Sequence, residues 1–232
     1  MWDWLLTQEQ QRRRLVKTLE DSPLRDYYRQ TFVSKKRTLD SLELVSVDLE
    51  TTGFNPQSDA ILSIGQLDIR HNQIELATAQ HTVIRSHTDI DAASAVVHGI
   101  TDDRSAAGVS LREAVSQLLA SMAGKVMLVH YSSLEQRFLD QACQTLFGGP
   151  FMVPIVDTLY LARRRYQRQH KSFKGNELRL HNLRAELGLP RYQAHNALSD
   201  ALATAELYLV QIDQAGGSQG MKLSDILSPR HA

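Results

Sequence analysis

The sequence has few of the features that mark secreted, zinc-binding or membrane proteins. Its 232 residues include a single cysteine, Cys143, which excludes an internal disulfide and a cysteine-rich zinc site. No apolar run approaches the length of a membrane span, and the first residues lack the basic start and apolar core of a secretory signal. The net charge of +0 excludes a global attraction to polyanions, so any such signal must be local. We therefore expect a cytoplasmic enzyme or binding protein with no membrane partner.

The composition is that of a globular protein, with 42% hydrophobic and 22% charged residues. Residues 1–40 are polar and are expected to form an N-terminal helical extension. Its three consecutive arginines, Arg12 to Arg14, are more typical of a solvated helix face than of a nucleic-acid contact. We expect one main domain at 41–213 and a C-terminal tail at 214–232.

From Leu42 onward the pattern predicts an α/β fold. The first three expected strands have short links, including the turn candidate His71-Asn72, and this indicates an antiparallel meander. Strands and helices then alternate, so we expect a mixed sheet covered on both faces. Besides the strand that begins near Leu42, the expected strands are 60–70, 73–85, 126–129 and 155–156, and the expected helices are 111–122, 133–147, 158–168, 178–187 and 197–212.

The first strand carries two carboxylates at its end. Asp48 and Glu50 are two residues apart and therefore project from the same face. Neighbouring carboxylates at a buried position repel each other and lose hydration unless a cation lies between them. Hard divalent cations such as Mg²⁺ or Mn²⁺ suit an all-oxygen site. On this segment alone, a polar turn explains the pair equally well.

A histidine and an aspartate open the last long helix. Asn196 is a candidate N-cap, which would place Asp200 in the first turn and His195 in the preceding loop. On a continuous helix, residues five apart point roughly 140° away from each other, so His195 reaches Asp200 only from a loop. A loop histidine beside an anchored carboxylate suits a general base next to a metal.

Two further segments contain candidate site residues. His98 lies in a loop after the meander, where it could contact a ligand or cap the next element. Glu135 lies where the strand 126–129 meets its helix, a position at which α/β sheets bind ligands. The run Ser132-Ser133-Leu134-Glu135 also fits a capping box, in which the glutamate would bond back to the helix start.

In this order the segments resemble the DnaQ-like (DEDDh) family of 3′–5′ exonucleases, of the proofreading-subunit type, over about residues 42–212. The resemblance implies a ribonuclease H-like fold. Its first motif is matched by Asp48-Leu49-Glu50-Thr51-Thr52-Gly53, and a later segment by His98-Gly99-Ile100-Thr101. The third motif is matched by His195-x-Ala197-x-x-Asp200-Ala201-x-Ala203-Thr204.

The second motif departs from the family pattern. The family usually reads His-Asn-Ala-x-Phe-Asp-x-x-Phe-Leu, and here the run is His130-Tyr131-Ser132-Ser133-Leu134-Glu135-Gln136-Arg137-Phe138-Leu139. Phe138 and Leu139 fix the register, so Glu135 stands in the aspartate's place with its carboxylate one methylene further out. Because catalytic geometry is sensitive to displacements of about 1 Å, a lower rate or an altered metal preference would follow.

The resemblance also implies a mechanism and its residues. Two Mg²⁺ or Mn²⁺ ions roughly 4 Å apart would be held by four carboxylates, with His195 as the general base that deprotonates the attacking water. The terminal nucleotide would be held at Thr51, Phe54 and His98. The metal ligands would be Asp48, Glu50, Glu135 and Asp200.

A local cluster of cations supports a polyanionic substrate. The segment from Arg163 to Arg184 contains eight arginines and lysines but only one acidic residue, Glu177. The aromatic residues Tyr166 and Phe173 are interleaved with these cations. Backbone contact plus base stacking would explain this mixture, and a solvated helix face is the alternative.

The expected function is therefore metal-dependent hydrolysis from a 3′ end, with release of nucleoside 5′-monophosphates. DNA proofreading or repair, with a single-stranded 3′ end and a DNA polymerase as partners, is the leading interpretation. The alternatives are 3′ trimming of RNA or short oligonucleotides, and a weakly active polymerase-accessory module.

Overall fold

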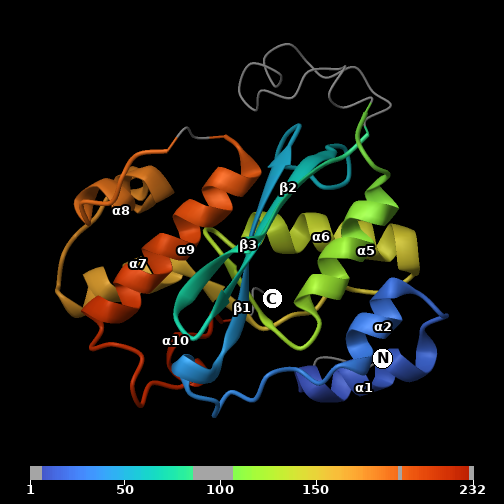
Figure 1. Ribbon diagram of the computed structural model, residues 1–232, viewed down its shortest axis with the longest axis horizontal. Coiled ribbons are helices and arrows are strands. Elements are labelled where there is room, and N and C mark those ends of the chain that lie inside the picture. Colours follow the sequence, from blue (N-terminus) through green and yellow to red (C-terminus); the bar gives the residue numbers. More distant parts are fainter. Residues whose placement is uncertain (1–6, 86–106, 193–194, 230–232) are drawn as a thin grey trace.

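The computed structural model describes residues 7–85, 107–192 and 195–229. A five-stranded sheet in the order β3-β2-β1-β4-β5 forms its centre (Figure 1). The strands are β1 Glu43–Thr51, β2 Ile61–Arg70, β3 Gln73–Val83, β4 Val126–Val129 and β5 Ile155–Asp157. The helices are α1 Gln8–Thr18, α2 Pro23–Arg29, η2 Leu39–Ser41, α5 Leu111–Met122, α6 Ser133–Phe147, α7 Thr158–Arg168, η3 Gly175–Leu178, α8 Leu180–Glu186, α9 Ala197–Gln214 and α10 Leu223–Ile226.

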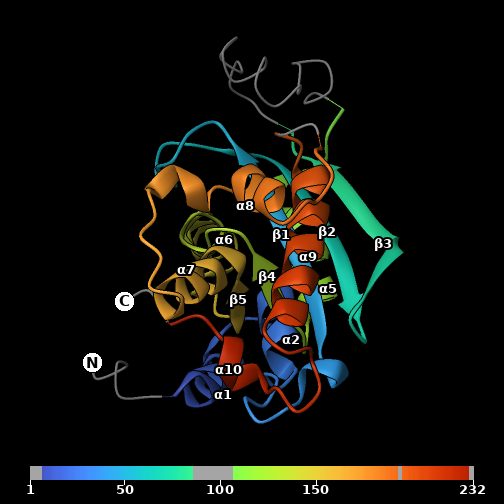
Figure 2. The ribbon, with the colours of Figure 1, turned by 90° about the vertical axis from the view of Figure 1, so that its left-hand side faces the viewer.

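The sheet is mixed and is covered on both faces, as expected. β1 pairs antiparallel with β2 and parallel with β4. Val45 and Val47 belong to the hydrophobic cluster shared with α5 and α6, whereas Leu44 belongs to the cluster shared with α9. The alternation of apolar residues along β1 thus supplies two cores, one on each side of the sheet (Figures 1 and 2).

The predicted meander is confirmed. β2 and β3 are joined at His71 and Asn72, both in the left-handed region with φ of 50° and 58°. Two successive left-handed residues form a two-residue hairpin turn, and the twist of this turn matches the right-handed twist of the strands on either side. β3 ends at Val83, two residues before the expected end.

Helix α9 lies unusually close to the sheet. A Cβ placed on Gly65 of β2 would lie 2.1 Å from the carbonyl carbon of Ala197, at the start of α9. The Ser46 hydroxyl of β1 donates a buried hydrogen bond of 2.7 Å to the carbonyl oxygen of Ala201. Gly65 is the register partner of Asp48 on β1. The first turn of α9 therefore packs directly beside the end of β1 that carries Asp48 and Glu50 (Figure 2).

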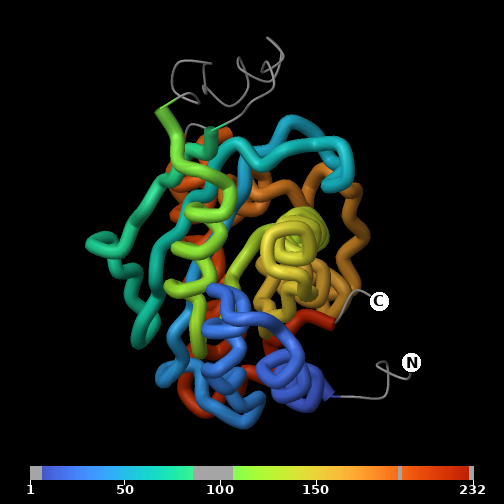
Figure 3. Tube along the Cα trace, turned by 90° about the vertical axis from the view of Figure 1, so that its right-hand side faces the viewer, coloured from blue at the N-terminus to red at the C-terminus, as the bar shows by residue number. Residues whose placement is uncertain are grey.

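The N-terminal helices pack against the domain rather than standing apart from it (Figure 3). The hydroxyls of Tyr27 and Tyr28 donate hydrogen bonds to the carbonyl oxygens of Met152 and Pro150. Arg12 is buried, pairs with Glu9 and donates to the carbonyl oxygen of Tyr28. The expected solvated face is therefore wrong for Arg12, because α2 covers it. A division of the chain at residue 40 stays a prediction.

The C-terminal segment also returns to the sheet. Isolated bridges join Thr38 to Lys222 and Val156 to Leu227, and the side chains of Leu223 and Ile226 are buried in the cluster beneath α9. In the part of the chain that the structure describes, no helix has both the length and the apolar character needed to cross a membrane.

Candidate metal and catalytic site

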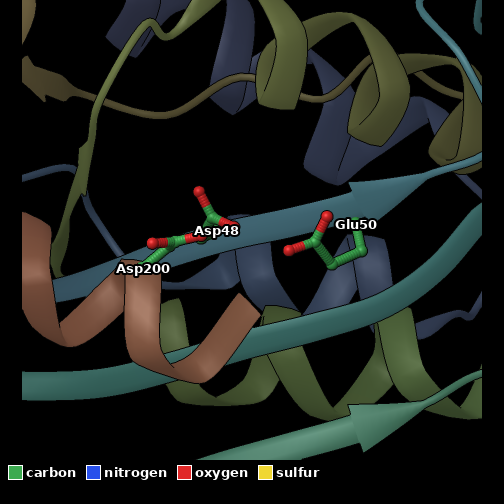
Figure 4. A group of neighbouring side chains, drawn as sticks. All are labelled: Asp48, Glu50 and Asp200. Carbon is green, nitrogen blue, oxygen red and sulfur yellow. The ribbon is translucent and has the colours of Figure 1, made fainter. Parts of the chain in front are cut away.

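Three predicted site carboxylates converge. Asp48 and Glu50 project from the end of β1, and Asp200 projects toward them from the first turn of α9 (Figure 4). One ligand oxygen from each residue lies within 4.8 Å of the others. Glu50 is buried, and the other two are half-buried. Two of the three carboxylates therefore come from β1 and the third from α9, about 150 residues later in the chain.

This arrangement makes ionisation of the carboxylates costly. Burial raises the pKa of Asp48 well above its ordinary value, and the charges of Glu135, Asp200 and Glu50 raise it further. Burial, followed by the charge of Asp200, raises the pKa of Glu50 to about 8. A carboxyl group with so high a pKa holds its proton at neutral pH unless a cation replaces it.

Glu135 lies near this group without being one of the three. Among the charges around Asp48, that of Glu135 has the largest effect on the Asp48 pKa. Glu135 is only 2% exposed, and burial raises its own pKa to about 8. Its Oε2 atom is buried and has no hydrogen-bond partner. An ion or a water molecule at this position would supply the missing partner.

The capping box considered for Glu135 does not form. The Ser132 side chain makes no capping bond to the first turn of α6, and the Ser132 N–H donates instead to Oδ2 of Asp157 at 2.8 Å. Asp157 Oδ1 accepts from the N–H of Tyr131 and, on α7, from that of Leu159. One buried carboxylate therefore organises both helix starts.

Sequence reasoning missed Asp157. The available signal was its position, directly after an apolar strand and before a helix, where an aspartate is a strong N-cap. Its neighbour His130 is held by Thr158 Oγ1 and the Leu178 carbonyl oxygen, and burial lowers the pKa of His130 to about 4.

His195 and Asp200 meet in the predicted way. Asn196 caps α9 by accepting from Ser199 N–H, so Asp200 lies in the first turn. His195 has a φ of 66°, a left-handed conformation that is uncommon outside glycine. Its backbone N–H donates to Oδ2 of Asp200 at 3.0 Å. Burial raises the pKa of Asp200, although this hydrogen bond opposes the shift.

The three residues expected to hold the terminal nucleotide lie in different environments. Thr51 is buried, and its hydroxyl donates to the Gly53 carbonyl oxygen at 2.7 Å. Phe54 is 81% exposed on the loop that follows β1. His98 lies outside the described residues.

A cleft of about 540 Å³ opens over Asp48, Asp200 and His195. The exposed cationic side chains of Arg179 and Arg191 line this cleft, and so do the exposed side chains of His181 and Tyr192. Arg191 and Tyr192 lie beyond the segment to which the sequence had assigned nucleic-acid contact. The cleft is therefore lined by the carboxylates of Asp48 and Asp200 and by arginine side chains.

The predicted base stacking is wrong for Tyr166 of the basic segment, because its ring is buried. Tyr166 is only 1% exposed and packs against Phe173, with ring centroids 5.5 Å apart. Arg184 is buried and pairs with Glu206 at 2.7 Å. The spacing of the cations was visible in the sequence, but the side of the helix that each one occupies was not.

The residues present fit hard divalent cations. The carboxylates of Asp48, Glu50 and Asp200, with Glu135 nearby, offer only oxygen donors, which Mg²⁺ and Mn²⁺ prefer. The unpartnered Oε2 of Glu135 and the raised pKa values of Asp48 and Glu50 both favour a cation at this position.

Comparison with known sequences gives one family and several relatives. The sequence model of the exonuclease family matches residues 45–208. A PolC-type DNA polymerase III of Thermotoga petrophila is 28% identical over 194 residues, which make up 84% of this chain and 14% of that protein. The chain thus spans about one-seventh of that relative's length. The DNA polymerase III subunit epsilon of Treponema pallidum is 26% identical over 182 residues, covering 78% of this chain and 82% of the relative.

A solved structure gives the fold. The nuclease domain of 3′hExo, a DEDDh family member bound to rAMP, superimposes with a TM-score of 0.66 at 16% identity. The match covers 80% of this chain and 100% of that domain. The expected ribonuclease H-like fold, a mixed sheet flanked by helices, is confirmed.

Proposed function

The chain belongs to the exonuclease family, in the DnaQ-like (DEDDh) branch that its motifs resemble, and on that basis we propose that it trims nucleic acid from the 3′ end. The released products would be nucleoside 5′-monophosphates. The observation that carries this proposal is the convergence of Asp48, Glu50 and Asp200 within 4.8 Å, beneath a cleft that also contains His195.

The residues divide the chemistry among them. Asp48, Glu50, Asp200 and Glu135 would hold two Mg²⁺ or Mn²⁺ ions, which when bound supply Lewis-acid activation of water and neutralise charge on the leaving oxygen. His195 takes a proton from the attacking water as the water oxygen bonds to phosphorus and the bond to the 3′-oxygen breaks. The departing 3′-oxygen receives a proton from solvent. Asp200 fixes the end of the loop that carries His195, because its Oδ2 accepts a hydrogen bond from the His195 backbone N–H.

The cleft wall suits a polyanion. Arg179 and Arg191 line the same cleft as Asp48 and Asp200. The arginines can therefore bind backbone phosphates of the substrate while its terminal phosphodiester lies at the carboxylates. Phe54, exposed at the end of β1, offers an aromatic face for a base. In this proposal Thr51, Phe54 and His98 hold the terminal nucleotide.

DNA is the proposed substrate, with a DNA polymerase as partner and a cytoplasmic location. The relatives named as DNA polymerase III proteins support this choice. RNA is the second candidate, since the superimposable 3′hExo domain is described as bound to rAMP.

The test is release of mononucleotides from 3′-labelled single-stranded and duplex DNA and RNA, with Mg²⁺, with Mn²⁺ and with chelator. We expect trimming of single-stranded DNA that requires the metal. Asp48→Ala should lower it by more than the 10–100-fold typical of changes outside the ligand shell. Asp213→Ala, an exposed carboxylate near the other end of α9, is the matched control and should be unaffected. Absence of mononucleotides from every wild-type reaction would refute the proposal.

A further inference from the structure

The loop that leads to His195 is tied to α9 by a group of side chains that the mechanism above does not use. Arg184 of α8 is buried, and its guanidinium donates to the carbonyl oxygens of Ala203 and Pro190 at 2.7 and 2.8 Å. It also pairs with Glu206 of α9 at 2.7 Å. A single side chain therefore joins α8, the following loop and α9.

Tyr192 completes this arrangement. Its hydroxyl donates to Glu206 Oε1 at 2.7 Å, and the Arg184 guanidinium carbon lies 4.8 Å from the centre of its ring. The two Glu206 oxygens are thus divided between Arg184 and Tyr192. Such cation–π stacking and charge-assisted hydrogen bonds are stronger than neutral contacts and restrict the tyrosine ring.

Tyr192 lies close in sequence to His195, the proposed general base. Only two residues separate Tyr192 from His195, whose backbone N–H is bonded to Asp200. Tyr192, His195 and Asp200 all line the cleft. The loop is therefore held to α9 on both sides of the two intervening residues, once through Glu206 and once through Asp200.

We propose that Arg184, Glu206 and Tyr192 form a latch that positions the His195 loop for hydrolysis, so that Tyr192 and Glu206 are positioning residues. This inference rests on the proposed function, because it assigns the latch to the reaction of that site. Partners that orient reactive groups from outside the ligand shell typically change activity 10–100-fold. The latch should therefore act on kcat and leave substrate binding largely intact.

The test compares three conservative variants in steady-state assays on single-stranded DNA. Tyr192→Phe and Glu206→Gln should each lower kcat about tenfold, with KM changed less than about twofold. The melting temperature should be unchanged in Tyr192→Phe and lower in Glu206→Gln, because that variant leaves the buried Arg184 without its carboxylate partner. Tyr160→Phe is the matched control, since Arg164 stacks on its ring at 5.5 Å while its hydroxyl has no hydrogen bond among the described residues. That variant should behave as wild type.

A double-mutant cycle with His195→Ala then separates positioning from other roles. If Tyr192 acts through His195, Tyr192→Phe should cause little further loss in the His195→Ala background, measured in single-turnover reactions. Additive losses, or a rise in KM alone, would overturn the latch and make Tyr192 a substrate contact.

Amide hydrogen exchange at His195 gives a readout that does not need activity. Faster exchange at this amide in Tyr192→Phe, with the rest of α9 unchanged, supports the latch, whereas unchanged exchange contradicts it. A wild-type protein without nuclease activity would refute the proposed function, and the exchange experiment would still decide about the latch.

Discussion

The two parts of the carboxylate site are held in different ways. Asp48, Glu50 and Asp200 depend on backbone packing, in which α9 rests on Gly65 and is bonded to Ser46. Glu135 depends on a side chain, because Asp157 organises the start of α6. Backbone contacts cannot adjust without moving a whole helix, whereas a side-chain contact can adjust locally. The first part should therefore tolerate almost no change, and the second should tolerate more.

The most severe test of this difference is Gly65→Ala. The added methyl of this β2 residue would lie 2.1 Å from the Ala197 backbone, so α9 must move away from the sheet and carry Asp200 and His195 with it. A displacement of about 1 Å can cost about a hundredfold in rate, and we expect at least that loss in kcat. The control is Gly175→Ala, since a Cβ there meets nothing within 4 Å. Full activity of Gly65→Ala in a folded protein would show that the close approach is not needed.

A smaller effect is expected when the support of Glu135 is weakened. Asp157→Asn replaces one acceptor oxygen by an NH₂ group, which faces the Ser132 N–H. Loss of a cap costs about 0.5–2 kcal/mol, and about 1 kcal/mol lowers the Tm by about 2–4 °C in a chain of this size. Thermal melting and kcat should fall together. Asp140→Asn, which keeps an acceptor for its partner Phe151 N–H, should melt like wild type.

The pH dependence tests both parts together. Glu50 and Glu135 each have a pKa raised from 4.5 to about 8, so the folded protein binds protons that the unfolded chain releases. Without divalent ions, the free energy of unfolding should therefore fall as the pH rises from about 4.5 to about 8. Mg²⁺ or Mn²⁺ should reverse this loss, most strongly near pH 8, where protons no longer compete.

Thermal melts in chelator and in metal, at pH 5 and pH 8, measure this dependence. Glu135→Gln should flatten the chelator curve, because it removes one of the groups that titrate in this range. A melting temperature independent of pH in chelator would contradict the raised pKa values.

The smallest effect is expected from Glu135→Asp. The carboxylate is retained and shortened to the length usual at this motif, and the local support of α6 can adapt. Activity should be kept or raised, as measured by kcat with Mg²⁺ and Mn²⁺. Glu135→Gln, which keeps the length and removes the charge, should lose activity. A large loss in Glu135→Asp would mean that the site is built for glutamate and that its two parts are equally rigid.

Much of the fold could be predicted from periodicity. The alternation along β1 and the spacing on α5 and α6 placed these elements within one or two residues, because each buries one regular face. Asp48, Glu50 and Asp200 were selected by strand and cap geometry together with the motif order. Their convergence required only that α9 cross β1.

The rest depended on contacts between distant residues. The sequence marks Gly65 as a glycine in a strand but does not say that Ala197 lies against it. Arg184 and Tyr166 looked like surface residues in a basic segment, yet Glu206 and Phe173 bury them. A cation count cannot reveal which cations have acidic partners from other helices.

The tyrosines of α2 have a consequence for how the molecule opens. Their hydroxyls are bonded to carbonyl oxygens at residues 150 and 152, and their rings belong to the cluster that includes Cys143 of α6. Residues 23–29 should therefore unfold with the main cooperative unit rather than fray from it. In native-state exchange, the amides of α2 should share the slow rates of α6, and cutting the chain before β1 would remove part of the core.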